Sequence, residues 1–351
     1  MTQIIYIAIL ALGLWIGYIA EKKDRKAYIY FLILLLTFLA GFRGENCGVD
    51  TPSYYDNIVK GFPYPWMFRE EGFRAMAIFF MNRFKNPQLV FISCAFITNY
   101  LILKRLWDFR KEASYSFMVL IYVLLYYSNS MNIMRQYVAV ALIFYGTRYL
   151  KKNKLFFIPF LMLAFSFHRS SLLAIGYFGI ALWRDFSKKQ KVLFSLPMLF
   201  VVTGSFVYVS THLAKDISSY SAQVTDNVNA TYFYLLIITL LVLITYKLRI
   251  GIKITEHITP NKDARGQLEG DVSLYVLIGL AFKALSMFFK FVGRTGLYYS
   301  IFDVVFWGIA CKNLKNARLN RVLILIYAIY IFMVVVVRND IMLFPYEVFF
   351  Y

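Results

Sequence analysis

Apolar runs of about 15 to 20 residues alternate with short polar segments along almost the whole chain. A helix of that length can cross the hydrocarbon core of a bilayer, which is about 30 Å thick. The pattern therefore predicts an all-α, polytopic bundle of about twelve transmembrane helices that forms a single integral membrane domain, 1–351. The predicted spans are 2–20, 27–42, 87–103, 114–127, 131–147, 155–167, 171–183, 192–209, 231–246, 271–289, 296–311 and 322–337.

One apolar segment, 72–84, is too short to be counted as a span. If it crossed the membrane, the basic cluster that follows the next span would lie outside. We therefore expect it to be a re-entrant or surface-lying helix at the end of a large outer loop, 43–71. A second outer loop is predicted at 210–230. The first run, 2–20, is expected to be a retained helix, which an uncleaved signal anchor would resemble.

The composition supports a membrane protein. Hydrophobic residues make up 60% of the chain and aromatic residues 19%, whereas only 16% are charged. An ordinary soluble domain has about 25% charged residues. A soluble chain this apolar could not cover its surface with polar groups, so lipid is expected to solvate much of it.

The net charge of +19 would suit a nucleic-acid-binding protein, but its distribution does not. The segments 21–26, 104–112, 148–154, 184–191, 247–271 and 312–321 hold 25 of the 38 Lys and Arg residues and 9 of the 19 acids. Their net charge is +16, against +3 for the rest of the chain. The positive-inside rule makes these segments cytoplasmic loops and places both termini outside. No nucleic-acid partner is predicted.

Several kinds of site are missing from the sequence. The cysteines Cys47, Cys94 and Cys311 have neither disulfide nor metal-ligand spacing. There is no phosphate-binding Gly-rich loop, zinc motif or Asp-x-Asp pair. We therefore expect no metal and no cofactor, and an enzyme of this kind would take substrates that reach it already activated in the membrane.

The informative residues are cations at the outer ends of helices, where they oppose the charge bias. Arg135 follows a polar run at the outer start of the fifth predicted span. The i, i+3, i+7 spacing of Asn129, Asn132 and Gln136 predicts one shared helical face with Arg135 beside it. Such a stripe is costly against lipid, so it should face a wet cavity or form amide contacts with another helix.

Three further regions, at Arg43, at His168 and at Arg294, also place basic residues at the outer ends of helices. Arg43 ends the second span, and the sequence allows either an ion pair with Asp50 or Glu45 or a functional role. His168 and Arg169 lie where the sixth span turns into the seventh. Histidine exchanges protons readily near neutrality, so His168 is either structural or a general base.

Lys290 and Arg294 lie at the outer junction of the tenth and eleventh spans. Their i, i+4 spacing would place them on one face of a continuing helix. Lys290 could simply extend its amine to the membrane surface, whereas the planar fork of Arg294 suits a phosphate better.

These motifs together resemble the EpsG family over about residues 30 to 180. The motifs that carry the resemblance are Arg43-Gly44, Gly48-Val49-Asp50-Thr51 with Tyr54, Glu71-Gly72-Phe73, Asn132-Ile133-Met134-Arg135-Gln136, Tyr149-Leu150-Lys151-Lys152 and Phe167-His168-Arg169-Ser170-Ser171. Beyond that region it rests on hydropathy and on Arg294 with Tyr298.

The resemblance implies a Wzy-type polymerase of bacterial exopolysaccharide, capsule or O-antigen in the inner (plasma) membrane. Such a glycosyltransferase moves a growing glycan from undecaprenyl pyrophosphate onto a lipid-linked repeat unit at the outer face. The implied partners are undecaprenyl-pyrophosphate-linked oligosaccharides and membrane lipid, with a chain-length regulator and a flippase as further candidates.

The residues suit that chemistry, because fixed cations can stabilise a pyrophosphate leaving group without a metal. We expect Arg135 and Arg294 to bind the pyrophosphate and His168 to act as the base, with Asp50 or Glu71 as substitutes. Arg43 would close the site. The remaining candidates for substrate binding are Gln136, Asn132, Arg169, Lys290 and Tyr55, the last by stacking on sugars, although interfacial aromatic residues give the same composition.

Three other functions remain open from the sequence. A lipid-linked oligosaccharide flippase or transporter should show repeats and polar residues at the bilayer midplane, and the candidates here cluster at outer helix ends instead. An O-antigen ligase would use a similar set of arginine and histidine residues. A membrane acyltransferase would need a histidine within reach of a cytoplasmic acyl donor.

Overall fold

The computed structural model describes residues 2–63, 68–151, 153–187, 190, 262–286 and 290–313, together with short pieces between 322 and 347. Every regular element of this described part is a helix, which confirms the predicted all-α class. The elements are α1 Thr2–Lys23, α2 Lys26–Gly41, α3 Thr51–Val59, α4 Glu71–Phe84, α5 Gln88–Asp108, α6 Tyr115–Tyr122, η1 Val123–Tyr127, α7 Ser128–Asn132, α8 Met134–Gly146, η2 Thr147–Tyr149, η3 Lys154–Phe156, α9 Phe157–Phe167, η4 Arg169–Ala174, α10 Ile175–Asp185, α13 Lys262–Leu285, α14 Lys290–Thr295, α15 Leu297–Ser300 and α16 Phe302–Asn313.

The helices agree closely with the apolar runs in the sequence, but the number of membrane spans stays a prediction. Among the described residues, α5 is the one helix that is both long and apolar enough to cross a membrane. Shorter apolar helices cover Lys26–Gly41, Lys154–Phe167 and Val272–Leu285. The predicted spans 192–209 and 231–246 and the predicted loop 210–230 lie outside the described residues, as does most of 322–337.

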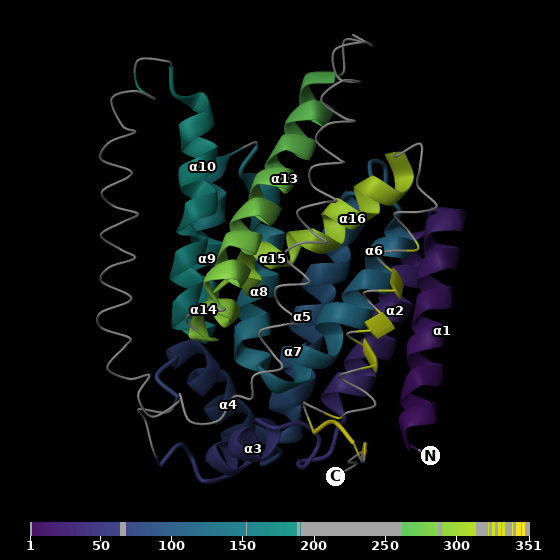
Figure 1. Ribbon diagram of the computed structural model, residues 1–351. Coiled ribbons are helices and arrows are strands. Elements are labelled where there is room, and N and C mark those ends of the chain that lie inside the picture. The colour runs from purple at the N-terminus through teal and green to yellow at the C-terminus, as the bar shows by residue number, and fades with distance from the viewer. Residues whose placement is uncertain are drawn as a thin grey trace.

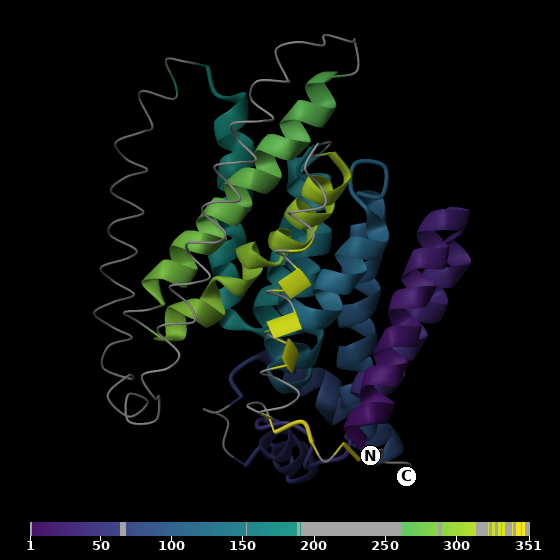
Figure 2. The same ribbon diagram turned by 45° about the vertical axis from the view of Figure 1, so that its right-hand side comes forward.

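The long helices stand side by side, and α3 and α4 lie across one end of the bundle (Figures 1 and 2). The start of α1 is at this α3–α4 end. The C-terminal segment reaches the same end, because the backbone N–H of Gly44 donates to the carbonyl of Glu347 at 2.7 Å. The first and last described residues of the chain thus lie with the predicted outer loop, although the membrane orientation itself stays a prediction.

At the opposite end of the bundle, which we call the basic end, several of the described turns and helix ends that the charge distribution predicts to be cytoplasmic meet. Arg110, just after α5, pairs with Asp24 of the α1–α2 turn at 2.8 Å. Lys312, in the last turn of α16, donates to the backbone carbonyls of Arg110 and Lys111 at 2.9 and 2.8 Å. Segments far apart in sequence therefore meet at one end, as antiparallel helices require.

Close backbone approach and buried hydroxyl groups hold the helices together. A Cβ atom at Gly41 would lie only 2.8 Å from the Cα of Ile92, so α2 and α5 can pack this tightly only because residue 41 is glycine. The Tyr127 hydroxyl donates to the carbonyl of Leu36 at 2.5 Å, linking η1 to α2. Such bonds satisfy polar groups that lipid could not.

Candidate functional site

Arg135 lies in the first turn of α8, at the α3–α4 end of the bundle. Its Nη1 donates to Oε2 of Glu70 at 2.5 Å, and its Nε donates to the hydroxyl of Tyr54 at 3.4 Å. The guanidinium carbon lies 4.5 Å from the ring centroid of Phe68. Helix α3 and the loop that follows it thus supply a carboxylate and aromatic rings that together fix the guanidinium.

His168 faces the other oxygen of the same carboxylate. It follows α9, and its Nδ1 lies 3.5 Å from Oε1 of Glu70. That nitrogen is buried and makes no hydrogen bond within the described part of the chain. The side chain as a whole is 26% exposed, so solvent or a ligand can reach the ring. Glu70 therefore joins His168 and Arg135, which are 33 positions apart in the sequence.

The surroundings keep the Glu70 carboxylate ionised. Burial by itself raises the pKa of Glu70, but contact with His168 and the positive charge of Arg135 outweigh it, so that the pKa is lowered. An ionised carboxylate can orient an imidazole for proton transfer, while the guanidinium beside it can bind an anion.

The segment 290–300 forms another wall of this site. The side-chain amide of Gln136, next to Arg135, donates to the backbone carbonyl of Arg294 in α14. The hydroxyls of Ser170 and Tyr298 lie 3.1 Å apart, which links η4 to α15. The Arg294 side chain is exposed, and that of Lys290 lies outside the described residues. The side chains of Arg135 and His168 thus meet at one site, whereas Arg294 contacts this site through its backbone carbonyl.

Asn132, at the end of α7, and Asp50, in the outer loop, border the same region. Gly48 adopts φ +107°, and a Cβ there would collide with Oδ1 of Asn132, so the loop packs directly on the end of α7. Asp50 precedes α3 and is half-buried. Its carboxylate makes no ion pair or side-chain hydrogen bond to another described residue.

The predicted shared face of Asn129, Asn132 and Gln136 is wrong. The helix is interrupted at Ile133, whose φ of −91° and ψ of 53° separate α7 from α8. Gln136 therefore belongs to a different helix from the two asparagines. The turn at Ile133 exposes backbone carbonyls that need hydrogen-bond donors.

Arg43 donates to one of these carbonyls, and the ion pair with Asp50 or Glu45, one of the two alternatives that the sequence allows, is not present among the described residues. Arg43 is 2% exposed, and its Nη2 donates to the carbonyl of Met131 at 2.6 Å. Nη1 donates to the carbonyl of Ala40, and the guanidinium carbon lies 4.9 Å from the ring centroid of Phe91. Arg43 thus ties α2 to the α7–α8 turn and is too enclosed to contact a ligand in this conformation.

The structure brings Glu70 into the site, whereas the sequence predicts its neighbour Glu71 as a site residue. Glu70 is 9% exposed and lies at the N-cap position of α4 without a side-chain cap hydrogen bond, whereas Glu71 is exposed in the first turn. In the sequence, the one feature that points to Glu70 is its position next to Glu71. Arg169 is exposed and donates to the backbone carbonyl of Arg69 at 3.4 Å, and Tyr55 is half-buried against the core.

The described residues contain no cluster of three His, Cys, Asp or Glu side chains suited to a metal ion. Comparison with family models identifies one family for this chain. The model of the EpsG family matches residues 26–348. Neither the curated proteins nor the solved structures gave a match. The family match covers nearly the whole chain, and the chain belongs to the EpsG family, a membrane-associated family of Wzy-type polymerase-like proteins.

Proposed function

We propose that this protein is a polysaccharide polymerase that transfers a growing glycan from undecaprenyl pyrophosphate to a lipid-linked repeat unit, at the outer face of the bacterial inner (plasma) membrane. The observation that carries the proposal is the Glu70 carboxylate, shared between Arg135 and His168 at the α3–α4 end. Membership of the EpsG family supports the reaction class. The acceptor and donor would both enter from the membrane, with a flippase supplying them.

Arg135 would bind the pyrophosphate of the donor. Its Nη2 makes no hydrogen bond to a described residue, and the side chain is 16% exposed. When the glycosyl–oxygen bond breaks, negative charge develops on the leaving undecaprenyl pyrophosphate, which a fixed guanidinium stabilises. The exposed Arg294, held next to Gln136, is the second cation for this role.

His168 would accept the proton of the attacking hydroxyl. Because Nδ1 faces Glu70, Nε2 is the nitrogen left for the acceptor. The acceptor oxygen forms the new bond to the anomeric carbon, its proton passes to Nε2, and undecaprenyl pyrophosphate leaves with the electron pair of the broken bond. Glu70 stabilises the imidazolium that forms, as the carboxylate does in other carboxylate–histidine pairs. Asp50 remains the substitute base, and Asn132 and Tyr55 remain candidates for sugar contacts.

The reaction class is tested by deleting the gene and separating the surface polysaccharide by gel electrophoresis. A polymerase predicts that the ladder of chain lengths collapses to a single repeat unit. Complete loss of surface sugar would instead indicate export. Full-length chains that are not attached would indicate a ligase. Either of these two results would contradict the proposal.

Replacing His168 by glutamine is expected to lower the rate of polymerisation by about 10²- to 10⁴-fold, the usual contribution of a general base. A general base works only in its unprotonated form, so a rate that depends on a histidine base should fall on acidification. The remaining rate of polymerisation in His168→Gln should therefore no longer fall as the pH is lowered. The measurement is the initial rate with lipid-linked repeat units between pH 5 and 8, and an unchanged pH profile would assign the base to Asp50.

A further inference from the structure

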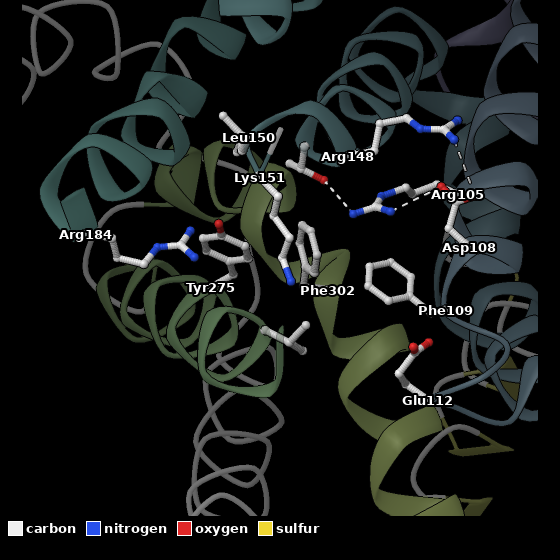
Figure 3. Close-up of a pocket in the computed structure, with 12 residues that line it drawn as sticks. Arg105, Asp108, Phe109, Glu112, Arg148, Leu150, Lys151, Arg184, Tyr275 and Phe302 are labelled. Carbon is white, nitrogen blue, oxygen red and sulfur yellow. Dashed lines mark hydrogen bonds and ion pairs between the residues drawn. The ribbon is translucent and has the colours of Figure 1, made fainter. Parts of the chain in front are cut away.

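A cavity of about 140 Å³ opens at the basic end of the bundle, remote from the Glu70 site. Arg135 and Arg148 lie near opposite ends of α8, whose 13 residues span about 20 Å. The cavity lies between the ends of α5 and α10, η2, α13 and α16 (Figure 3). Its volume equals roughly that of four or five waters, at about 30 Å³ each, which is enough for one small polar group.

Cations from separate segments surround this cavity. Arg105 comes from α5, Arg148 from η2, Lys151 from the loop after it and Arg184 from α10. Figure 3 shows Arg184 and Arg105 on opposite sides with Lys151 between them. Asp108 and Glu112 are the two carboxylates among the described lining residues, so the lining carries an excess of two positive charges.

The hydrogen bonding of Arg105 is incomplete. Its side chain is 11% exposed, and its Nε is buried without a hydrogen-bond partner in the described structure. Nη1 shares Asp108 with Arg148, at 3.2 and 3.7 Å respectively, and Nη2 reaches the hydroxyl of Thr147 at 3.4 Å. One carboxylate, that of Asp108, is therefore shared by two guanidinium groups. The Nε of Arg105 remains a buried donor without an acceptor, which costs free energy unless a ligand supplies one.

Aromatic walls strengthen any charge interaction inside the cavity. The guanidinium carbon of Arg105 lies 4.3 Å from the ring centroid of Phe109, which fixes its plane. The rings of Tyr275 and Phe302 form another wall, with centroids 4.9 Å apart. Electrostatic attraction is stronger beside such low-dielectric surfaces than in water.

We propose that this cavity binds a phosphate group, with Arg105, Arg148, Lys151 and Arg184 as the cationic ligands. Planar guanidinium forks match phosphate oxygens, and basic pockets between membrane helices bind phospholipid head groups on the cytoplasmic side. The phosphate comes either from an anionic lipid of the inner leaflet or from a soluble phosphate or pyrophosphate. This site is independent of the glycosyl transfer proposed above, because it rests on residues at the other end of the bundle.

The two sources are separated by two arms with the purified full chain. In the first, sodium pyrophosphate is titrated in detergent and the rise in melting temperature is compared with that in sodium chloride at equal ionic strength. In the second, the protein in nanodiscs with or without phosphatidylglycerol is examined by native mass spectrometry for retained lipid. Stabilisation by pyrophosphate indicates a soluble ligand, and selective retention of phosphatidylglycerol indicates a lipid ligand.

Variants connect either result to the cavity. Arg184→Gln and Lys151→Gln should weaken binding by about tenfold or more, since each removes one charge-assisted contact. Arg25→Gln and Lys111→Gln are matched controls, because both side chains are exposed at the same end and neither lines the cavity. Equal binding in cavity and control variants, stabilisation by sodium chloride alone, or no binding in either arm would overturn the proposal. The use of two separate cavity variants guards against the failure of one to fold.

Discussion

Replacing Glu70 by glutamine is expected to reduce polymerisation by about 10²- to 10⁴-fold, the range for loss of an acid–base partner. Glutamine has the same shape, but it lacks the negative charge that Arg135 and His168 both face. The imidazolium formed during proton transfer would lose its stabilisation. The Arg135 guanidinium, which is only 16% exposed, would also lose its carboxylate. The measurement is chain length in complemented cells, together with the initial rate on purified lipid-linked repeats.

Glu71→Gln is the matched control, since it removes the same charge one residue later. Glu71 is exposed in the first turn of α4, so its replacement should leave chain length unchanged. If both variants lost activity equally, general charge in the loop would explain the effect. Activity of Glu70→Gln close to that of the parent protein would remove Glu70 from the mechanism.

A second variant separates chemistry from folding. Glu70→Gln leaves Arg135 partly buried without its counter-charge, which by itself lowers stability. The double variant Glu70→Gln/Arg135→Gln removes both charges and should recover much of the melting temperature. We expect it to remain inactive. Recovery of polymerisation together with stability would show that the pair is only structural.

The helices were predictable from the sequence because the length and spacing of apolar runs are local properties. The region 72–84 shows this well, since its short apolar run predicted a helix outside the spans, and α4 covers Glu71–Phe84 at the end of the bundle. Arg135 and His168 were predictable as candidates for a related reason. A polar group at the outer end of an apolar helix is costly, and that cost is visible in one sequence.

The choice between Glu70 and Glu71 was not predictable in the same way. It depends on where α4 begins: Glu70 lies just before the first turn and points to Arg135, whereas Glu71 lies within it. Helix boundaries are the least certain part of a sequence pattern. Arg43 illustrates a second limit, because its partner is the carbonyl of Met131, freed by the turn at Ile133 and 88 positions away.

Replacing Arg135 by lysine is expected to be almost as damaging as replacing it by alanine, with a loss of about 10²- to 10³-fold in the rate of polymerisation. The guanidinium uses Nη1 for Glu70 and Nε for Tyr54, which leaves Nη2 for the donor pyrophosphate. Its carbon also lies 4.5 Å from the ring centroid of Phe68. A lysine ammonium is a single point charge and cannot make these contacts at fixed angles.

The products formed show whether an Arg135 variant has lost polymerisation alone or has lost the folded protein. In both Arg135 variants single repeat units should accumulate on the lipid carrier, because only polymerisation is removed. Arg83→Ala is a suitable control, since Arg83 is exposed near the end of α4 and should be dispensable. Full chain length in Arg135→Lys would reduce the role of Arg135 to plain positive charge. Full chain length in Arg135→Ala would exclude Arg135 from the site altogether.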